Sequence, residues 1–155
     1  MNFRISGLSP EPFRYLYGLS EEELALKGAK RYVVDKKPGF PDRIAMRDVD
    51  LGERVLLLNH VCQPANTPYR ATHAIFIGEG SEVPYDRVGE IPEVMRLRLL
   101  SLRAYDAEHM MIDADVVDGR EVEPVIHRLL ANPQVAYIHA HNAKRGCYCG
   151  LIERA

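Results

Sequence analysis

The clearest hairpin of the chain is VAYIHAHNAKRGCYCGLIER, residues 135–154. Its two halves, VAYIHAHN and GCYCGLIER, mix β-branched, aromatic and apolar residues as strands do, and the turn-forming run NAKRG at 142–146 joins them. Two strands joined by so short a turn pair in the antiparallel sense. The sequence therefore predicts an antiparallel sheet that contains both halves of this hairpin.

Similar apolar runs between turn residues predict further strands upstream. We expect one sheet built from strands near 55–61, 71–78, 99–105, 109–117, 135–141 and 147–154. Apolar residues at helical spacing instead predict a helix over 124–131, with Pro124 at its first position and Asn132-Pro133 as its stop. The predicted fold class is α+β, a single domain over residues 1–155 with a largely antiparallel β-sheet and a few helices packed on it.

The segment VMRLRLLSLRAYD at 94–106 shifts the phase of its apolar residues between Leu99 and Leu100. A β-bulge and a change from helix to strand would each produce this shift, and the sequence leaves both open. With a bulge, one polar face would carry Arg96, Arg98, Ser101, Arg103 and Tyr105.

Length, composition and charge exclude several classes of protein. The chain has 155 residues, 46% hydrophobic and 27% charged, which is ordinary for a globular domain with one core. Its formal net charge is -2, whereas a general nucleic-acid binder would be basic, so no nucleic-acid partner is expected. The longest apolar runs, such as VLLL at 55–58, are far shorter than the roughly 20 residues of a membrane span, so no membrane partner is expected.

The N-terminal residues and the number of cysteines indicate the cellular compartment in which the protein is expected. No apolar segment of signal-peptide length follows Met1, so we expect a cytoplasmic protein. An odd number of cysteines, three, then indicates reduced thiols in place of a disulfide framework.

Four ligand-type side chains gather in the hairpin. His139 and His141 share one strand face, and Cys147 and Cys149 share another. A five-residue loop would place His141 opposite Cys147 and His139 opposite Cys149, whereas a four-residue loop would separate the two pairs. Two His and two Cys suit zinc, but the C-x-C spacing differs from that of usual structural sites. We therefore expect no cofactor, with zinc on these four residues as the alternative.

Other histidines and a third cysteine stand apart from the hairpin. His60 and Cys62 follow a buried run and could extend a metal site, although a lone histidine there is more often a packed core residue. His73 and His109 stand alone in the sequence.

Cys147 also suggests a reactive thiol. A cysteine is nucleophilic as its thiolate, which nearby cations favour. Lys144 and Arg145 precede Cys147, and His141 could lie across the ladder as its partner. The alternative is a buried cysteine with a packing role.

Several stretches together resemble the bacterial domain-of-unknown-function family 1203: PGFPDR, GERVLLL, PYRATHAIFI, LRAYDAEHMMIDADVVDG and NPQVAYIHAHNAKRGCYCGLIER. The resemblance is collinear over nearly the full chain, and Asn142, Gly146, Cys147 and Arg154 carry its most characteristic part. The family has no assigned reaction. It implies a candidate site made of Tyr69, Arg70, Arg103, Tyr105, Asn142 and Cys147.

The sequence also departs from the family pattern. Asp42 stands where the family's PCR motif has a cysteine, and His73, His139 and Cys149 are particular to this chain. These departures speak against a zinc site on all four hairpin residues.

The leading hypothesis for function is a domain that binds a small anionic molecule near the C-terminal hairpin and that could act as an enzyme. Arg70 and Arg103 would hold the anion, Asn142 would orient it, and Cys147, with His141, would be the nucleophile or form the wall. The alternatives are a zinc-binding module and a non-catalytic domain that forms a homodimer through an exposed part of its sheet.

Overall fold

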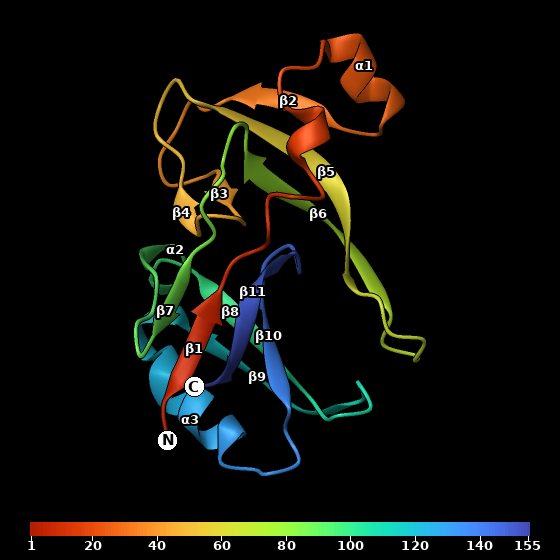
Figure 1. The fold of residues 1–155 in the computed structure, drawn as a ribbon. Coiled ribbons are helices and arrows are strands. Elements are labelled where there is room, and N and C mark those ends of the chain that lie inside the picture. The colour runs from red at the N-terminus through yellow and green to blue at the C-terminus, as the bar shows by residue number, and fades with distance from the viewer.

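The computed structural model describes all 155 residues, and its fold is α+β, as predicted (Figure 1). Strands in antiparallel sheets dominate, and the helices are short. The elements in chain order are β1 (Phe3–Ser6), η1 (Arg14–Leu16), α1 (Glu21–Leu26), β2 (Lys30–Val33), β3 (Pro41–Asp42), β4 (Arg47–Asp48), β5 (Arg54–Gln63), β6 (Ala71–Gly78), β7 (Asp86–Val88), α2 (Glu93–Arg96), β8 (Leu99–Tyr105), β9 (Met111–Asp118), η2 (Gly119–Glu121), α3 (Val122–Leu130), β10 (Tyr137–Asn142) and β11 (Tyr148–Arg154).

The larger sheet has the strand order β7-β1-β11-β10-β8-β9, with the predicted hairpin β10–β11 at its centre. Alternation along β8 and β10 turns Leu102, Ala104, Ile138 and Ala140 to one face, where they are fully buried. The helix α3 covers this face, and its apolar stripe completes the main core. The opposite face carries the polar residues of the same strands, among them His139 and Arg103, which are paired in the ladder.

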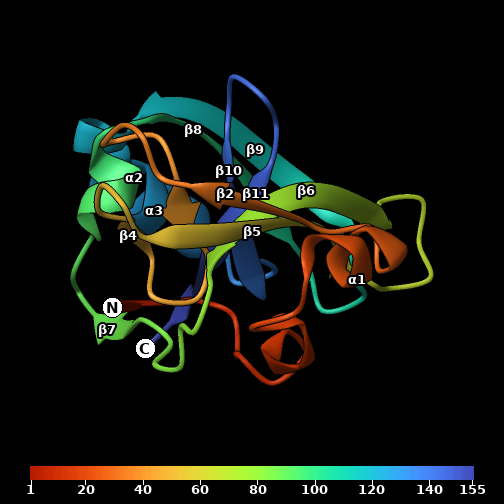
Figure 2. The same ribbon diagram turned by 90° about the horizontal axis from the view of Figure 1, so that it is seen from above.

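The smaller sheet, β2-β5-β6, lies above the larger one, and its strands cross those of the larger sheet in the view from above (Figures 1 and 2). Leu56, Leu58, Ile75 and Ile77 form its inner face and pack in one buried cluster with Tyr148 of β11. Our prediction of a single sheet is therefore wrong, because β5 pairs with β2 and with β6, and none of the three pairs with the larger sheet. Layers of a sandwich are joined by side-chain contacts, which strand patterns do not encode.

The predicted helix is confirmed as α3, although it begins two residues earlier, so that Pro124 is its third residue. The phase shift at Leu99–Leu100 is the change from helix to strand, since α2 ends at Arg96 and β8 begins at Leu99. The bulge interpretation of this segment is wrong. As a result Arg98 leaves the expected polar face and forms a bidentate pair with the buried Asp48.

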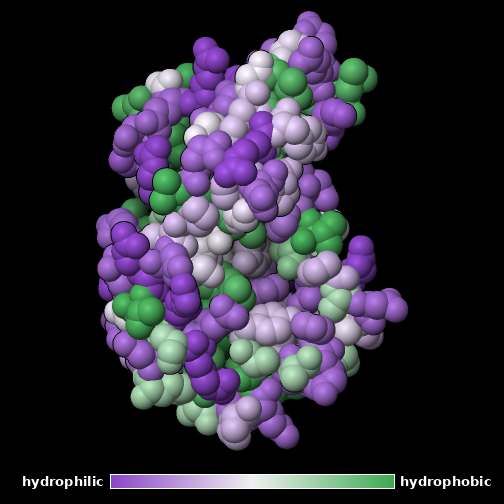
Figure 3. Space-filling view, in the orientation of Figure 1, coloured by the Kyte–Doolittle hydropathy of each residue, from purple (hydrophilic) through white to green (hydrophobic).

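The outer surface in the view of Figure 3 is mostly hydrophilic, with small and separate hydrophobic patches. None of the helices combines the length and the apolar character that crossing a membrane requires.

A shielded ion pair ties β2 to the residue that follows β6. Arg31 donates from Nε and Nη2 to the two carboxylate oxygens of Glu79, at 2.8 and 2.7 Å, and each side chain is only 11% exposed. These hydrogen bonds hold the pKa of Glu79 below its usual value. Because the folded pKa is lowered, the pair stabilises the fold above the unfolded pKa of about 4.3 and is lost as the pH falls through the folded value.

We therefore expect Glu79→Gln to lower the free energy of unfolding by about 2 kcal/mol at pH 7, since it removes the shielded carboxylate from Arg31 and leaves only the exposed Glu21 as its charged partner. The difference from wild type should shrink as the pH falls below about 4. Urea unfolding at several pH values measures this effect. The matched control is Glu82→Gln, which breaks the half-exposed pair with Arg14 and should cost under about 0.5 kcal/mol. Equal losses in the two variants would contradict the prediction.

Candidate functional site

The hairpin between β10 and β11 has a register different from the one we expected. The Asn142 amide donates to the Cys147 carbonyl at 2.9 Å, so the loop between these residues has four members, 143–146. His141 then lies opposite Tyr148 and His139 opposite Leu151, with a register shift between them that accommodates Cys149. The predicted pairing of His141 with Cys147 and of His139 with Cys149 is therefore wrong.

The shift separates the two cysteines of the hairpin. Cys149 is 2% exposed and lies in the main core that α3 covers, where burial raises the pKa of its thiol. Cys147 is only partly buried, at the end of the turn. The four hairpin residues of the alternative zinc site therefore do not converge, and His139 and His141 remain on the face toward the smaller sheet.

Cys147 contacts a buried guanidinium. Arg43, in the turn between β3 and β4, is 2% exposed and donates from Nη2 to Cys147 Sγ at 3.1 Å. Its Nε donates to the Tyr148 carbonyl and its Nη1 to the Pro41 carbonyl, both at 2.9 Å. Arg43 forms no salt bridge with a carboxylate, so the sulfur of Cys147 is the one group at its donors that can carry a negative charge. Asn142 Nδ2 is a second donor to this sulfur, at 3.7 Å.

Cys147 and Asn142 lie in the wall of a cleft of about 890 Å³ between the two sheets. Five cationic side chains and no carboxylate line this cleft: Lys36, Arg43, Arg98, Lys144 and Arg145. Of these, Arg98 is neutralised by Asp48, while Lys36, Lys144 and Arg145 form no ion pair. Packed rings of Tyr32, Phe40 and Phe76 supply an apolar wall.

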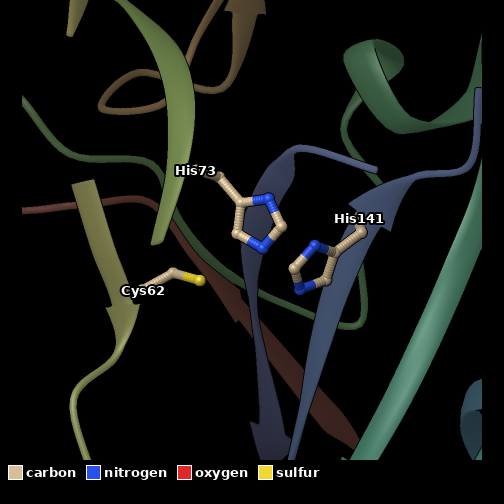
Figure 4. A group of neighbouring side chains, drawn as sticks. All are labelled: Cys62, His73 and His141. Carbon is tan, nitrogen blue, oxygen red and sulfur yellow. The ribbon is translucent and has the colours of Figure 1, made fainter. Parts of the chain in front are cut away.

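A second group of side chains gathers where the distal ends of β5 and β6 pass over β10. Cys62 of β5, His73 of β6 and His141 of β10 point toward one another, and one ligand atom of each lies within 4.8 Å of the other two (Figure 4). The rings of His73 and His141 are 4.9 Å apart between centroids. His60 stands beside this group and packs against Phe13 and Tyr148.

Burial lowers the pKa of the imidazoles in and around this group, those of His60, His73, His139 and His141. Burial lowers the pKa of His139 to about 4 and that of His141 to about 3, and the charge of Arg103 contributes in both cases. His73 Nε2, His139 Nδ1 and His141 Nε2 are buried without a hydrogen-bond partner. His141 Nδ1 lies 2.9 Å from the Gly146 carbonyl, which can only accept, so the proton is on Nδ1 and Nε2 bears the lone pair.

The candidate residues from the sequence fall into three places. Asn142 and Cys147 line the basic cleft. Arg103, partly buried, faces the histidines from β8, and its guanidinium has only Ser101 Oγ as a partner, at 3.5 Å. Tyr105 is buried and contacts Tyr69, with 6.4 Å between the ring centroids. Arg70 donates a hydrogen bond to the Pro64 carbonyl in the loop between β5 and β6. The sequence analysis therefore combined residues from these separate places into a single candidate site.

Two important residues were missed. Arg43 looked like an ordinary turn residue, although it belongs to the PGFPDR stretch that resembles the family. His73 looked isolated because its neighbours come from other strands.

Comparisons with known proteins match the chain to a family but do not assign it a reaction. The model of the family described as Protein of unknown function (DUF1203) matches residues 39–154. No curated protein and no solved structure matches the chain.

Proposed function

The chain belongs to the family DUF1203, whose members share a sequence pattern and no assigned activity, and we propose that it binds a small anionic molecule in the basic cleft, beside a thiolate at Cys147. The observation that carries this proposal is the 3.1 Å contact between the buried guanidinium of Arg43 and Cys147 Sγ.

A buried cation requires a counter-charge, because moving an unpaired charge out of water is costly. Arg43 has two carbonyl partners, which accept hydrogen bonds but do not neutralise it. The thiolate of Cys147 supplies the missing charge and receives a charge-assisted hydrogen bond in return. Cys147 is thus the most reactive thiol of the chain, and it opens onto the cleft.

The lining of the cleft selects the ligand. Lys36, Lys144 and Arg145 are unpaired cations on its rim, which attract and hold an anionic group. Tyr32, Phe40 and Phe76 offer an apolar wall to the remainder of the molecule. Asn142 Oδ1, buried without a partner, accepts a hydrogen bond from a hydroxyl or amide of the ligand. The ligand class is therefore a small anion with an apolar body and at least one donor.

This assignment of roles differs from our sequence-based expectation. Arg70 and Arg103 do not line the cleft, so the rim cations replace them as anion-binding residues. Arg43 replaces His141 as the group that favours the thiolate, since His141 is bonded to Gly146. A reduced thiol suits the cytoplasm, which we keep as the proposed compartment. The homodimer stays a prediction.

Alkylation tests the proposal directly. At pH 7 we expect iodoacetamide to modify Cys147 at least tenfold faster than Cys62 or Cys149 in the folded protein, because only Cys147 combines access with a cationic partner. Phosphate at constant ionic strength should slow the reaction at Cys147 by occupying the neighbouring cations. Peptide mass spectrometry over a time course gives the rate at each cysteine.

A charge-matched pair of variants controls this experiment. Lys144→Glu/Arg145→Glu should abolish the protection by phosphate, whereas Lys27→Glu/Lys30→Glu changes the net charge equally outside the cleft and should preserve it. Equal rates at all three cysteines, or a Cys147 that reacts only after unfolding, would refute the thiolate. Phosphate protection that survives in Lys144→Glu/Arg145→Glu would refute the anion site.

A further inference from the structure

Three buried imidazole nitrogens without partners form an anomaly that the basic cleft does not explain. A buried polar atom that lacks a hydrogen bond costs about 1–3 kcal/mol, so such atoms are few in native proteins. Here His73 Nε2 on β6 of the smaller sheet lies close to His139 Nδ1 and His141 Nε2 on β10 of the larger sheet. Two of these histidines, His73 and His141, belong to the group that also contains Cys62.

We propose that Cys62, His73 and His141 form a zinc site of the open type, in which three protein ligands leave one coordination position for a water or an exogenous anion. This site uses residues different from the His and Cys set of the hairpin, and it does not depend on the proposed function of the cleft.

The tautomer of His141 prepares it as a ligand. Its side chain is 1% exposed, and its Nδ1–H donates to the Gly146 carbonyl, so Nε2 bears the free lone pair on a ring that lies beside His73 and Cys62 (Figure 4). Metal-binding histidines commonly donate their second nitrogen to a backbone carbonyl in this way, which holds the ring in the ligating orientation. Such a bond is therefore the support that a zinc ligand requires.

The geometry is close to that of a tetrahedral site. Zinc distances of about 2.0–2.1 Å to nitrogen and 2.3 Å to sulfur place ligand atoms about 3.3–3.6 Å apart. The three ligand atoms already lie within 4.8 Å of one another, so small side-chain rotations bring them to these separations. Cys62 Sγ has only a weak partner, the Ala71 carbonyl at 3.5 Å, which it gives up when it loses its proton to become a ligand.

The surroundings define the fourth ligand. A divalent zinc with one thiolate retains a single positive charge, and no carboxylate belongs to the ligand group. Arg103 adds a second positive charge beside the histidines, with no acidic partner of its own. Two positive charges in a water-poor site attract an anion, so the open position should take hydroxide or a small anionic ligand that also contacts Arg103.

Cobalt binding tests the site with a spectroscopic readout. The full chain, without a histidine tag and stripped with a chelator, should take up one Co²⁺ per molecule and show the intense visible bands of a four-coordinate ion together with a thiolate-to-cobalt charge-transfer band. Zinc should displace the cobalt and raise the melting temperature by roughly 5–10 °C at about 100 times its Kd.

Variants separate this site from the alternatives. Cys62→Ser should abolish the charge-transfer band, and His73→Gln should weaken binding at least tenfold. Because His141 is fully buried, the half-buried His73 serves as the histidine test, with circular dichroism as the check on folding. His60→Ala removes a neighbouring histidine outside the ligand group and should retain the metal, as should Cys147→Ser/Cys149→Ser.

Two outcomes would overturn the proposal. The first is a folded wild-type protein that takes up no cobalt or zinc. The second is binding whose charge-transfer band survives in Cys62→Ser, which would assign the metal to other cysteines.

Discussion

Alkylation of Cys147 at pH 7 should become about tenfold slower or more when Arg43 is replaced by methionine. The thiolate is the reacting form, and a hydrogen bond to a charged group contributes about 1.5–3 kcal/mol, which corresponds to at least a tenfold change in the thiolate population. Methionine keeps much of the side-chain volume and removes the donor at 3.1 Å.

The same substitution should destabilise the fold. The carbonyls of Pro41 and Tyr148 lose their buried donors, which costs about 2–4 kcal/mol in the free energy of unfolding. Arg43→Lys retains the charge without the planar fork and should give intermediate reactivity. Lys36→Met removes a rim cation that does not touch the sulfur and should leave the rate of alkylation within about twofold. An unchanged rate in folded Arg43→Met would mean that the guanidinium does not activate the thiol.

Gly119→Ala should be the most destabilising single-atom change in the chain. A Cβ at this position would lie 1.8 Å from the Met95 carbonyl oxygen and 2.7 Å from that of Arg98. Both contacts are with backbone, and the Gly119 amide already donates to the Arg98 carbonyl at 2.8 Å, so η2 cannot move away from the end of α2 without losing this bond. We expect a loss of about 4 kcal/mol or more, and a melting temperature lower by roughly 10 °C or more.

Gly39→Ala is the matched control for this prediction. Its Cβ would meet only the flexible side chain of Lys36, with 2.8 Å to Cε, and Lys36 can move aside. The loss in this variant should stay below about 1 kcal/mol. Thermal unfolding followed by circular dichroism compares the two variants with wild type. A Gly119→Ala protein that melts within a few degrees of wild type would contradict the steric argument.

Local features of the fold could be predicted from the sequence, and the assembly of its layers could not. The apolar spacing in α3 and the turn after Asn142 depend on neighbours in the chain, so their patterns are readable. The assignment of β5 and β6 to a second sheet depends on contacts with Tyr148, which is about ninety residues away along the chain from β5. Strand patterns predict which residues are buried and leave the partner undetermined.

The candidate site divides in the same way. Cys147 and Asn142 were assigned to one candidate site from the sequence, and the hairpin turn brings Asn142 Nδ2 to 3.7 Å from Cys147 Sγ. The alternative zinc site on the four hairpin residues required a five-residue loop, and the loop has four residues, which changes the side chains that face one another. Arg43 and Cys147 are separated by more than one hundred residues, so no spacing rule connects them. The pairing of His60 with His73 could have been predicted from the register of the β5–β6 hairpin. The approach of His141 to His73 could not, because His141 lies on a strand of the other sheet.

The strand order of the larger sheet has a consequence for synthesis on the ribosome. β1 near the start of the chain pairs with β11 near its end, and Phe3 lies opposite Arg154. Until β10 and β11 emerge, β1 and β8 have no common partner, and the sheet exists only as two separate edges, β7-β1 and β8-β9. The nascent chain therefore carries unpaired strand edges through nearly all of its translation, and such edges favour association between incomplete chains until β10 and β11 fill the gap.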